Sequence, residues 1–176
     1  FDKQVNITSL TNRLTMKDGS VLDTNLLSAP LPVDAWARAG LMVRSDASNS
    51  YSQCLKIVAA NPTGANVVRV MGRGIDAQNY TLFSRDYAGV SNALPNQYLR
   101  MKRVGNNFSF YVSKDGVVWS MIGQSYQEMP STVYFGPYTA ASLAFADSLG
   151  NPPVENPDAL LSLAIATFTS YKDVDL

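Results

Sequence analysis

The sequence predicts an all-β fold of two packed antiparallel sheets, and three features point to it. Helical periodicity is nearly absent along the 176 residues, because apolar residues seldom recur at the spacings of an amphipathic helix. Short runs rich in Val, Ile, Tyr, Phe and Thr are present instead, separated by Gly, Asn, Asp, Pro and Ser. About ten such runs joined by tight turns are typical of an antiparallel sandwich or barrel.

Each predicted strand is a run of alternating or continuous apolar residues. Phe108, Phe110 and Val112, for example, alternate with Ser109 and Tyr111, so the first three side chains point to one face. The predicted strands span 3–10, 37–44, 53–59, 65–72, 80–85, 97–104, 107–113, 117–124, 132–141 and 161–171.

Turn residues connect these runs. Gly105-Asn106 and Asp115-Gly116 predict two hairpins, because both pairs tolerate the positive φ that such turns require. Segments 11–34 and 145–159 are interpreted as long loops, the first with room for one strand. The whole chain, 1–176, is expected to be one sandwich domain of a larger polypeptide.

Composition excludes several function classes. Fourteen Lys and Arg balance fourteen Asp and Glu, which argues against a nucleic-acid binder. The absence of His removes His-based catalytic triads and every His metal site. The single cysteine, Cys54, permits no internal disulfide and is interpreted as a buried hydrophobe. No apolar stretch approaches the ~20 residues of a membrane span.

Two linked segments carry a resemblance to a known family. Segments 34–44 (DAWARAGLMVR) and 98–119 (YLRMKRVGNNFSFYVSKDGVVW) resemble strands of bacterial concanavalin A-like jelly-roll domains, of the laminin-G-like or DUF1349-like kind. Segments 133–136 and 164–168 resemble its closing strands. The resemblance implies a jelly roll appended to a secreted or cell-surface protein. It also implies leading strands before Phe1, so an N-terminal piece is expected to be missing or supplied by a neighbour.

The acidic residues do not fit the pattern of the catalytic members of that superfamily. The resemblance implies that a catalytic member would carry two Glu on one strand. Carboxylates at alternate strand positions reach the glycosidic bond from a fixed separation. Here the only two Glu are Glu128, beside a turn, and Glu155, in a Pro-rich segment. We therefore expect a non-catalytic protein; a two-Asp site assembled from loops is the alternative.

Carbohydrate binding is the leading functional hypothesis, because sugars need aromatic faces for stacking and planar polar groups for their hydroxyls. Alternation places Arg69 on the strand face opposite Val68 and Val70. An ordinary solvated face is the other interpretation. The candidate ligand-binding residues are Arg69, Arg73, Asp76, Tyr80, Arg85, Tyr87 and Tyr138.

Both tryptophans have two interpretations, a core residue or a sugar-stacking platform. Trp36 opens the strand of segment 34–44. Trp119 follows a turn that resembles a shortened Asp-box hairpin, in which Asp115 hydrogen-bonds its own turn and Trp119 packs beneath it.

Ions, partners and location follow from the same features. Calcium is the cation expected, if any, because turns 46–49 and 147–151 are rich in Asp and Asn. A polysaccharide or other glycan is the expected partner, at an extracellular or cell-surface location. The competing hypothesis is a structural or assembly domain that contacts other subunits of an extracellular complex or filament through an unpaired sheet edge.

Overall fold

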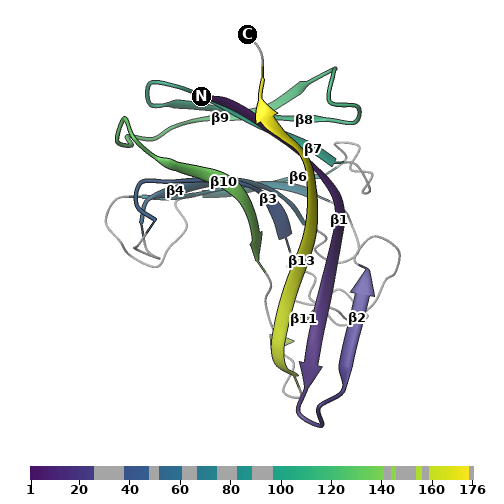
Figure 1. Cartoon of the computed structure of the whole chain (residues 1–176). Helices are drawn as coiled ribbons and strands as arrows, with labels where there is room; N and C mark the ends of the chain where they lie inside the picture. The colour runs from purple at the N-terminus through teal and green to yellow at the C-terminus, as the bar shows by residue number, and fades with distance from the viewer. Residues whose placement is uncertain are drawn as a thin grey trace.

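The computed structural model describes residues 1–25, 38–47, 52–60, 67–74, 83–88, 97–140, 144–145, 154–155 and 159–174. These residues form two main antiparallel sheets packed against each other (Figure 1). The predicted all-β sandwich is confirmed. The part of the chain that is described contains no helix that could cross a bilayer.

The first sheet has six strands in the order β13-β1-β7-β8-β9, with β2 beside β1. Figure 1 shows β1 and β13 running together beyond the body of the sandwich. The strands span Asp2–Met16 (β1), Val21–Asn25 (β2), Gln97–Val104 (β7), Asn107–Ser113 (β8), Ser120–Tyr126 (β9) and Ala159–Asp173 (β13).

The second sheet has five strands in the order β10-β3-β4-β5-β6. A separate two-stranded ladder joins Ala144–Phe145 (β11) to Val154–Glu155 (β12). The strands of the five-stranded sheet span Arg38–Arg44 (β3), Cys54–Ala60 (β4), Val67–Arg73 (β5), Phe83–Ala88 (β6) and Tyr134–Ala140 (β10).

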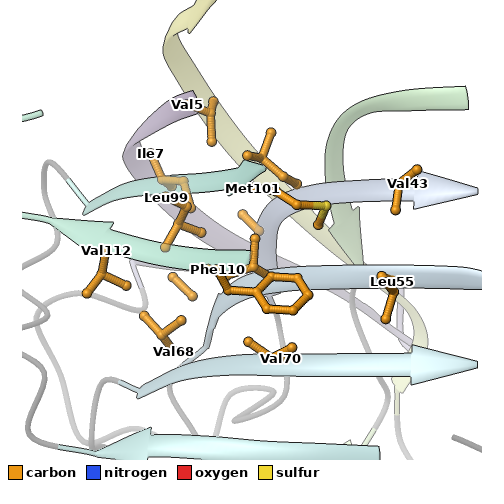
Figure 2. Close-up of a cluster of buried hydrophobic side chains, with 14 of the residues drawn as sticks. Val5, Ile7, Val43, Leu55, Val68, Val70, Leu99, Met101, Phe110 and Val112 are labelled. Atoms are coloured by element: carbon orange, nitrogen blue, oxygen red, sulfur yellow. The ribbon is translucent and has the colours of Figure 1, made fainter. Parts of the chain in front are cut away.

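The core lies between the two sheets and follows from alternation. Phe110 and Val112 of β8 face Val68 and Val70 of β5 across the interior (Figure 2), and all four are at most 3% exposed. Each buried side chain of this size stabilises the fold by roughly 1.5–3 kcal/mol. The core residues are Val5, Ile7, Leu10, Leu99, Met101, Phe108, Phe110 and Val112 from the first sheet, Ala39, Leu41, Val43, Leu55, Ile57, Ala59, Val68 and Val70 from the second, and Met129.

The predicted loop at 11–34 is wrong in its first part. Residues 11–16 complete β1, and β2 pairs back onto it. Asp18-Gly19 is a hairpin turn: the Ser20 amide and hydroxyl donate to Asp18 Oδ1 at 2.8 and 2.6 Å, and Gly19 has a φ of 84°. The predicted loop at 145–159 is likewise wrong in part, because it contains β12 and ends at the start of β13.

Strand boundaries also shift where side chains compete with the ladder. The predicted strand 117–124 begins at Ser120, because the Asp115 carboxylate accepts hydrogen bonds from the amides of Val117 and Val118 at 2.8 and 2.9 Å. Ser113 Oγ donates to the same carboxylate oxygen at 2.9 Å. The predicted strand 80–85 is described only from Phe83, where β6 begins.

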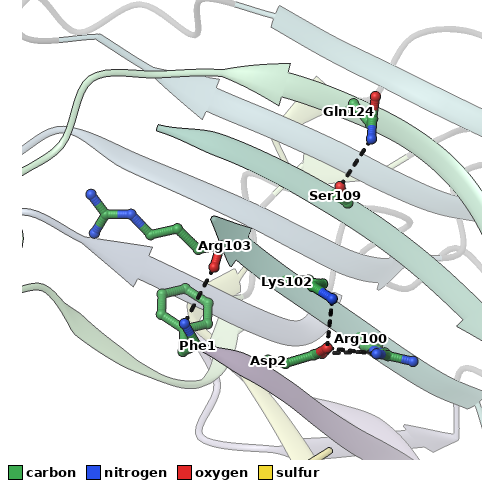
Figure 3. A network of polar contacts seen from close by, with 7 residues as sticks. All are labelled: Phe1, Asp2, Arg100, Lys102, Arg103, Ser109 and Gln124. Carbon is green, nitrogen blue, oxygen red and sulfur yellow. Dashed lines mark hydrogen bonds and ion pairs between the residues drawn. The ribbon is translucent and has the colours of Figure 1, made fainter. Parts of the chain in front are cut away.

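Polar groups connect strands that lie far apart in the sequence. Arg100 of β7 donates to both carboxylate oxygens of Asp2 at 2.7 and 2.6 Å (Figure 3). Arg103 donates to the carbonyl groups of Gly105, Met129 and Pro130. Arg103 therefore fixes the segment that leaves β9 and crosses to β10 in the other sheet.

Gly40 of β3 lies directly against the backbone of β4. A Cβ at this position would meet the Ile57 carbonyl oxygen and lie 2.7 Å from Val58 Cα. Because both are backbone atoms, we predict that Gly40→Ala lowers the free energy of unfolding by about 1–3 kcal/mol or more, the typical effect of overpacking. Denaturant unfolding measures it.

Gly136 on the neighbouring strand β10 is the matched control, since nothing lies within 4 Å of an added Cβ there. We expect Gly136→Ala to change stability by less than about 0.5 kcal/mol. Equal unfolding midpoints for the two variants would contradict the close approach of β3 and β4.

The Asp115 turn makes stability depend on pH. Amide donors from Val117 and Val118 and the Ser113 hydroxyl hold the Asp115 pKa below its ordinary value of 3.8. A lowered pKa contributes stability above 3.8, and this stability is lost as the pH falls through the folded-state pKa. We predict that Asp115→Asn lowers Tm at neutral pH and that the difference from wild type shrinks in strong acid.

Lys114→Ala is the control for this turn, because no hydrogen bond of the turn uses the Lys114 side chain. It is expected to leave Tm unchanged at both pH values. A deficit in Asp115→Asn that is equally large in strong acid would show that the carboxylate charge does not stabilise the turn.

Candidate functional site

The predicted ligand-binding residues fall into three groups. Arg69 and Arg73 lie on β5 and Tyr138 on β10, and all three side chains are partly exposed. For Arg85 and Tyr87 the structure describes the backbone, within β6. The remaining two, Asp76 and Tyr80, lie outside the described residues, as does Trp36.

The sheet register brings Arg69 and Tyr138 onto the same face. Tyr138 pairs with Gly40, Gly40 with Val58, and Val58 with Arg69. Directly opposed residues in a ladder point to the same side. The four residues therefore form one row across β10, β3, β4 and β5, on the outer face of the five-stranded sheet.

The same register aligns Arg85 and Tyr87 of β6 with different positions of β5 from Arg69. Arg85 pairs with Val70 and Tyr87 with Val68, and both valines belong to the core. Arg69 pairs instead with Asp86. Sequence alternation within β5 identified the polar face correctly, but it carried no information on which β6 residues share it.

Lys56 lies on β4, between the strands that carry Tyr138 and Arg69. Sequence reasoning did not identify it as a candidate residue. Its Nζ is 4.6 Å from the centroid of the Tyr138 ring, and it donates to the Tyr138 hydroxyl at 3.4 Å. A cation over an aromatic face is attracted by the ring quadrupole. The sequence does contain a signal for it, because Lys56 is the single charged residue between the apolar residues Leu55 and Ile57 in β4.

We call this surface the basic face. The middle of the row is covered, since Val58 is fully buried although it lies outside the core cluster. Cys54, on the same face, is 5% exposed. Among the described side chains of the face, every charged group is a cation, and the register also brings the backbone of Asp86 beside Arg69. The basic face comprises Arg38, Arg44, Lys56, Arg69, Arg73, Tyr134 and Tyr138.

Arg38, beside the row of Tyr138, adds a second feature to the basic face. Its Nε is buried and has no hydrogen-bond partner. A buried donor without an acceptor is costly, so an anionic group that reached this edge of the face would gain a hydrogen bond from Arg38. Arg44 differs, because its Nε donates to Ser52 Oγ at 3.2 Å.

The outer face of the other sheet carries Trp119, which lies outside the core cluster. The Arg100 guanidinium lies 5.6 Å from the Trp119 ring centroid and 5.1 Å from that of Tyr111. Asp2 hydrogen-bonds this guanidinium and raises the pKa of Arg100. Arg100 thus joins Asp2, Tyr111 and Trp119 in one cluster within the fold.

The described carboxylates take part in structural contacts. Asp2 is paired with Arg100, and Asp173 with Lys3 at 2.5 Å. Asp18 and Asp115 hold turns, and Glu128 accepts from the Tyr126 hydroxyl. The non-catalytic character of the chain stays a prediction.

A metal ion bound by protein side chains needs several acidic, thiol or imidazole groups close together. Within the part of the chain that the structure places, no three Asp, Glu, Cys or His side chains lie together as a metal site would require. Turn 147–151 and positions 48–49 of the other acidic turn fall outside it. Calcium binding by these turns therefore stays a prediction.

Comparisons with known proteins support the fold. No protein-family model matches the sequence, and no curated protein matches it. Five chains of solved structures match. One is the crystal structure of a functionally unknown protein from Saccharomyces cerevisiae, with 15% identity and a TM-score of 0.54 over 96% of this chain and 68% of that chain. This likeness extends to the fold alone.

Proposed function

We propose that the chain is a non-catalytic, lectin-like carbohydrate-binding domain and that its basic face holds a polysaccharide. The observation that carries the proposal is the row from Tyr138 to Arg69, with Lys56 against the tyrosine ring. This surface combines the Tyr138 ring with the planar guanidinium of Arg69 and the ammonium group of Lys56. These are the groups that stack on sugar rings and bind their oxygen atoms.

The two ends of the row lie a fixed distance apart. Tyr138 and Arg69 are separated by three strand spacings, or roughly 14 Å. A sheet holds its backbone rigidly, so the two ends keep this distance without a ligand. A rigid site loses less conformational entropy on binding than a flexible loop does.

The charge of the basic face favours an acidic polysaccharide. Its cations project from adjacent strands, while the whole chain is neutral with fourteen charges of each sign. Carboxylate or sulfate groups along a glycan would pair with Lys56 and approach the guanidinium of Arg69. The resemblance to concanavalin A-like jelly rolls favours a glycan as the ligand and an extracellular or cell-surface location.

Isothermal titration calorimetry with polygalacturonate oligomers tests this function. We predict measurable binding to wild type that weakens with added salt, since exposed charges are screened. Lys56→Ala and Tyr138→Ala are each expected to lower affinity about tenfold, which corresponds to the loss of one favourable contact. Arg69→Gln should have a similar effect.

Matched controls come from exposed residues elsewhere. Lys17→Ala alters a lysine in the β1–β2 turn, and Tyr126→Ala a tyrosine on β9 that is 64% exposed. Both should bind like wild type. Unchanged affinity in Lys56→Ala and Tyr138→Ala would refute the proposed site. Equally tight binding of single-stranded DNA would show a response to charge alone.

One observation favours the alternative function, an assembly domain. β13 is 15 residues long and forms the edge of its sheet beyond β1, and the β1–β13 ladder continues past the sandwich (Figure 1). A long edge strand offers backbone groups to a strand from another chain. β1 itself is paired on both sides within the sandwich, by β7 and β13.

Light scattering after size exclusion tests this alternative. An assembly domain that pairs through β13 is predicted to show a mass above one chain that rises with concentration. A monomeric mass at every concentration tested would exclude self-assembly through this edge.

A further inference from the structure

A cavity of about 300 Å³ opens at one end of the sandwich, where β7 begins, β8 ends and β9 begins. It is separate from the basic face, because its walls come from the six-stranded sheet. Register places Gln97 opposite Ile7 of β1, and Ser120 opposite Val112 of β8. These positions belong to the inner face of the sheet, so the cavity continues the space between the two layers.

Gln97 is an exception to the alternation that builds the core. It occupies the inward position that precedes Leu99 and Met101 in β7, yet it is polar and only 2% exposed. Its Nε2 donates to the Tyr98 carbonyl at 3.2 Å, whereas its Oε1 is buried and has no hydrogen-bond partner. A buried acceptor without a donor costs free energy, and a donor on a bound molecule would remove that cost.

The remaining walls are Val112, Ser113, Lys114, Asp115, Val118 and Ser120, so the mouth carries an apolar surface and one charge of each sign. Val112 is 3% exposed and Val118 is 71% exposed, so an apolar surface extends from the interior to the mouth. The Ser113 hydroxyl is already used, since it donates to Asp115 and accepts from the Gly116 amide at 2.9 Å. These bonds hold the wall rigid and leave Gln97 as the buried acceptor for a ligand.

We infer that this cavity is a second binding site, which takes one neutral sugar unit or similar polyol through a hydroxyl group that donates to Gln97 Oε1. The C–H face of the ring packs against Val112 and Val118. A charged ligand is disfavoured at the inner end because the buried amide is neutral and burying an unpaired charge is costly. The inference does not depend on the basic face, and either site can exist without the other.

NMR titration of the ¹⁵N-labelled chain tests this site, with methyl β-glucoside, methyl β-galactoside and methyl α-mannoside as probes. We expect at least one probe to shift the Gln97 side-chain amide and the backbone amides of 112–120 in a saturable way, with millimolar affinity. Gln97→Leu should weaken that binding about tenfold or more. Leu fits the inward position beside Leu99, so this variant is expected to fold.

A second variant tests the cavity at its exposed mouth, without altering a core position. Val118→Trp should fill the mouth and abolish binding, whereas Val117→Trp, at a neighbouring residue that is 79% exposed and outside the cavity wall, should not. Gln124→Leu is the matched control for loss of a glutamine, because Gln124 is exposed and bonds Ser109 on the outer face.

Two results would overturn the inference. One is the absence of a saturable shift with all three glycosides. The other is binding that persists in both Gln97→Leu and Val118→Trp. The variants at Lys56 and Tyr138 should leave glycoside binding unchanged, and Gln97→Leu should leave polygalacturonate binding unchanged, so failure at one site is distinguishable from failure at the other.

Discussion

The packing of alternate apolar side chains between two sheets fixes the register of the strands that build the core. β4 illustrates the constraint, because Leu55 and Ile57 point into the core and Lys56 points outward. A slip of one residue would expose both apolar side chains and bury the lysine charge. The core therefore determines which residues reach solvent as strictly as it determines which are hidden.

The basic face is a consequence of this constraint. Leu41, Ile57 and Val70 lie on adjacent strands and all point into the core. The residues that flank each of them along its own strand must therefore point outward and line up across the sheet. Tyr138 and Arg69 then lie in the same row although 68 residues separate them in the sequence. Turns and polar contacts hold the ends of this arrangement: Arg103 anchors the crossover to β10, and Asp2 joins β1 to β7 through Arg100.

Local signals in the sequence were sufficient for the fold and for part of the site. The alternation in β8 and the Gly105 turn, with a φ of 61°, each act within a few residues, so they predict the central hairpin. The contact between Lys56 and Tyr138 spans 82 residues and depends on the strand order β10-β3-β4, which no local pattern encodes. Asp18-Gly19 was a readable hairpin signal, but the prolines that follow it obscured β2.

We propose that the outer face of the five-stranded sheet is the surface that contacts a polysaccharide. The most direct measurement is mapping of backbone amide shifts on addition of a galacturonate trimer. Binding at this face predicts shifts concentrated in β3, β4, β5 and β10. Shifts concentrated in β7, β8 and β9, or none at all, would contradict it.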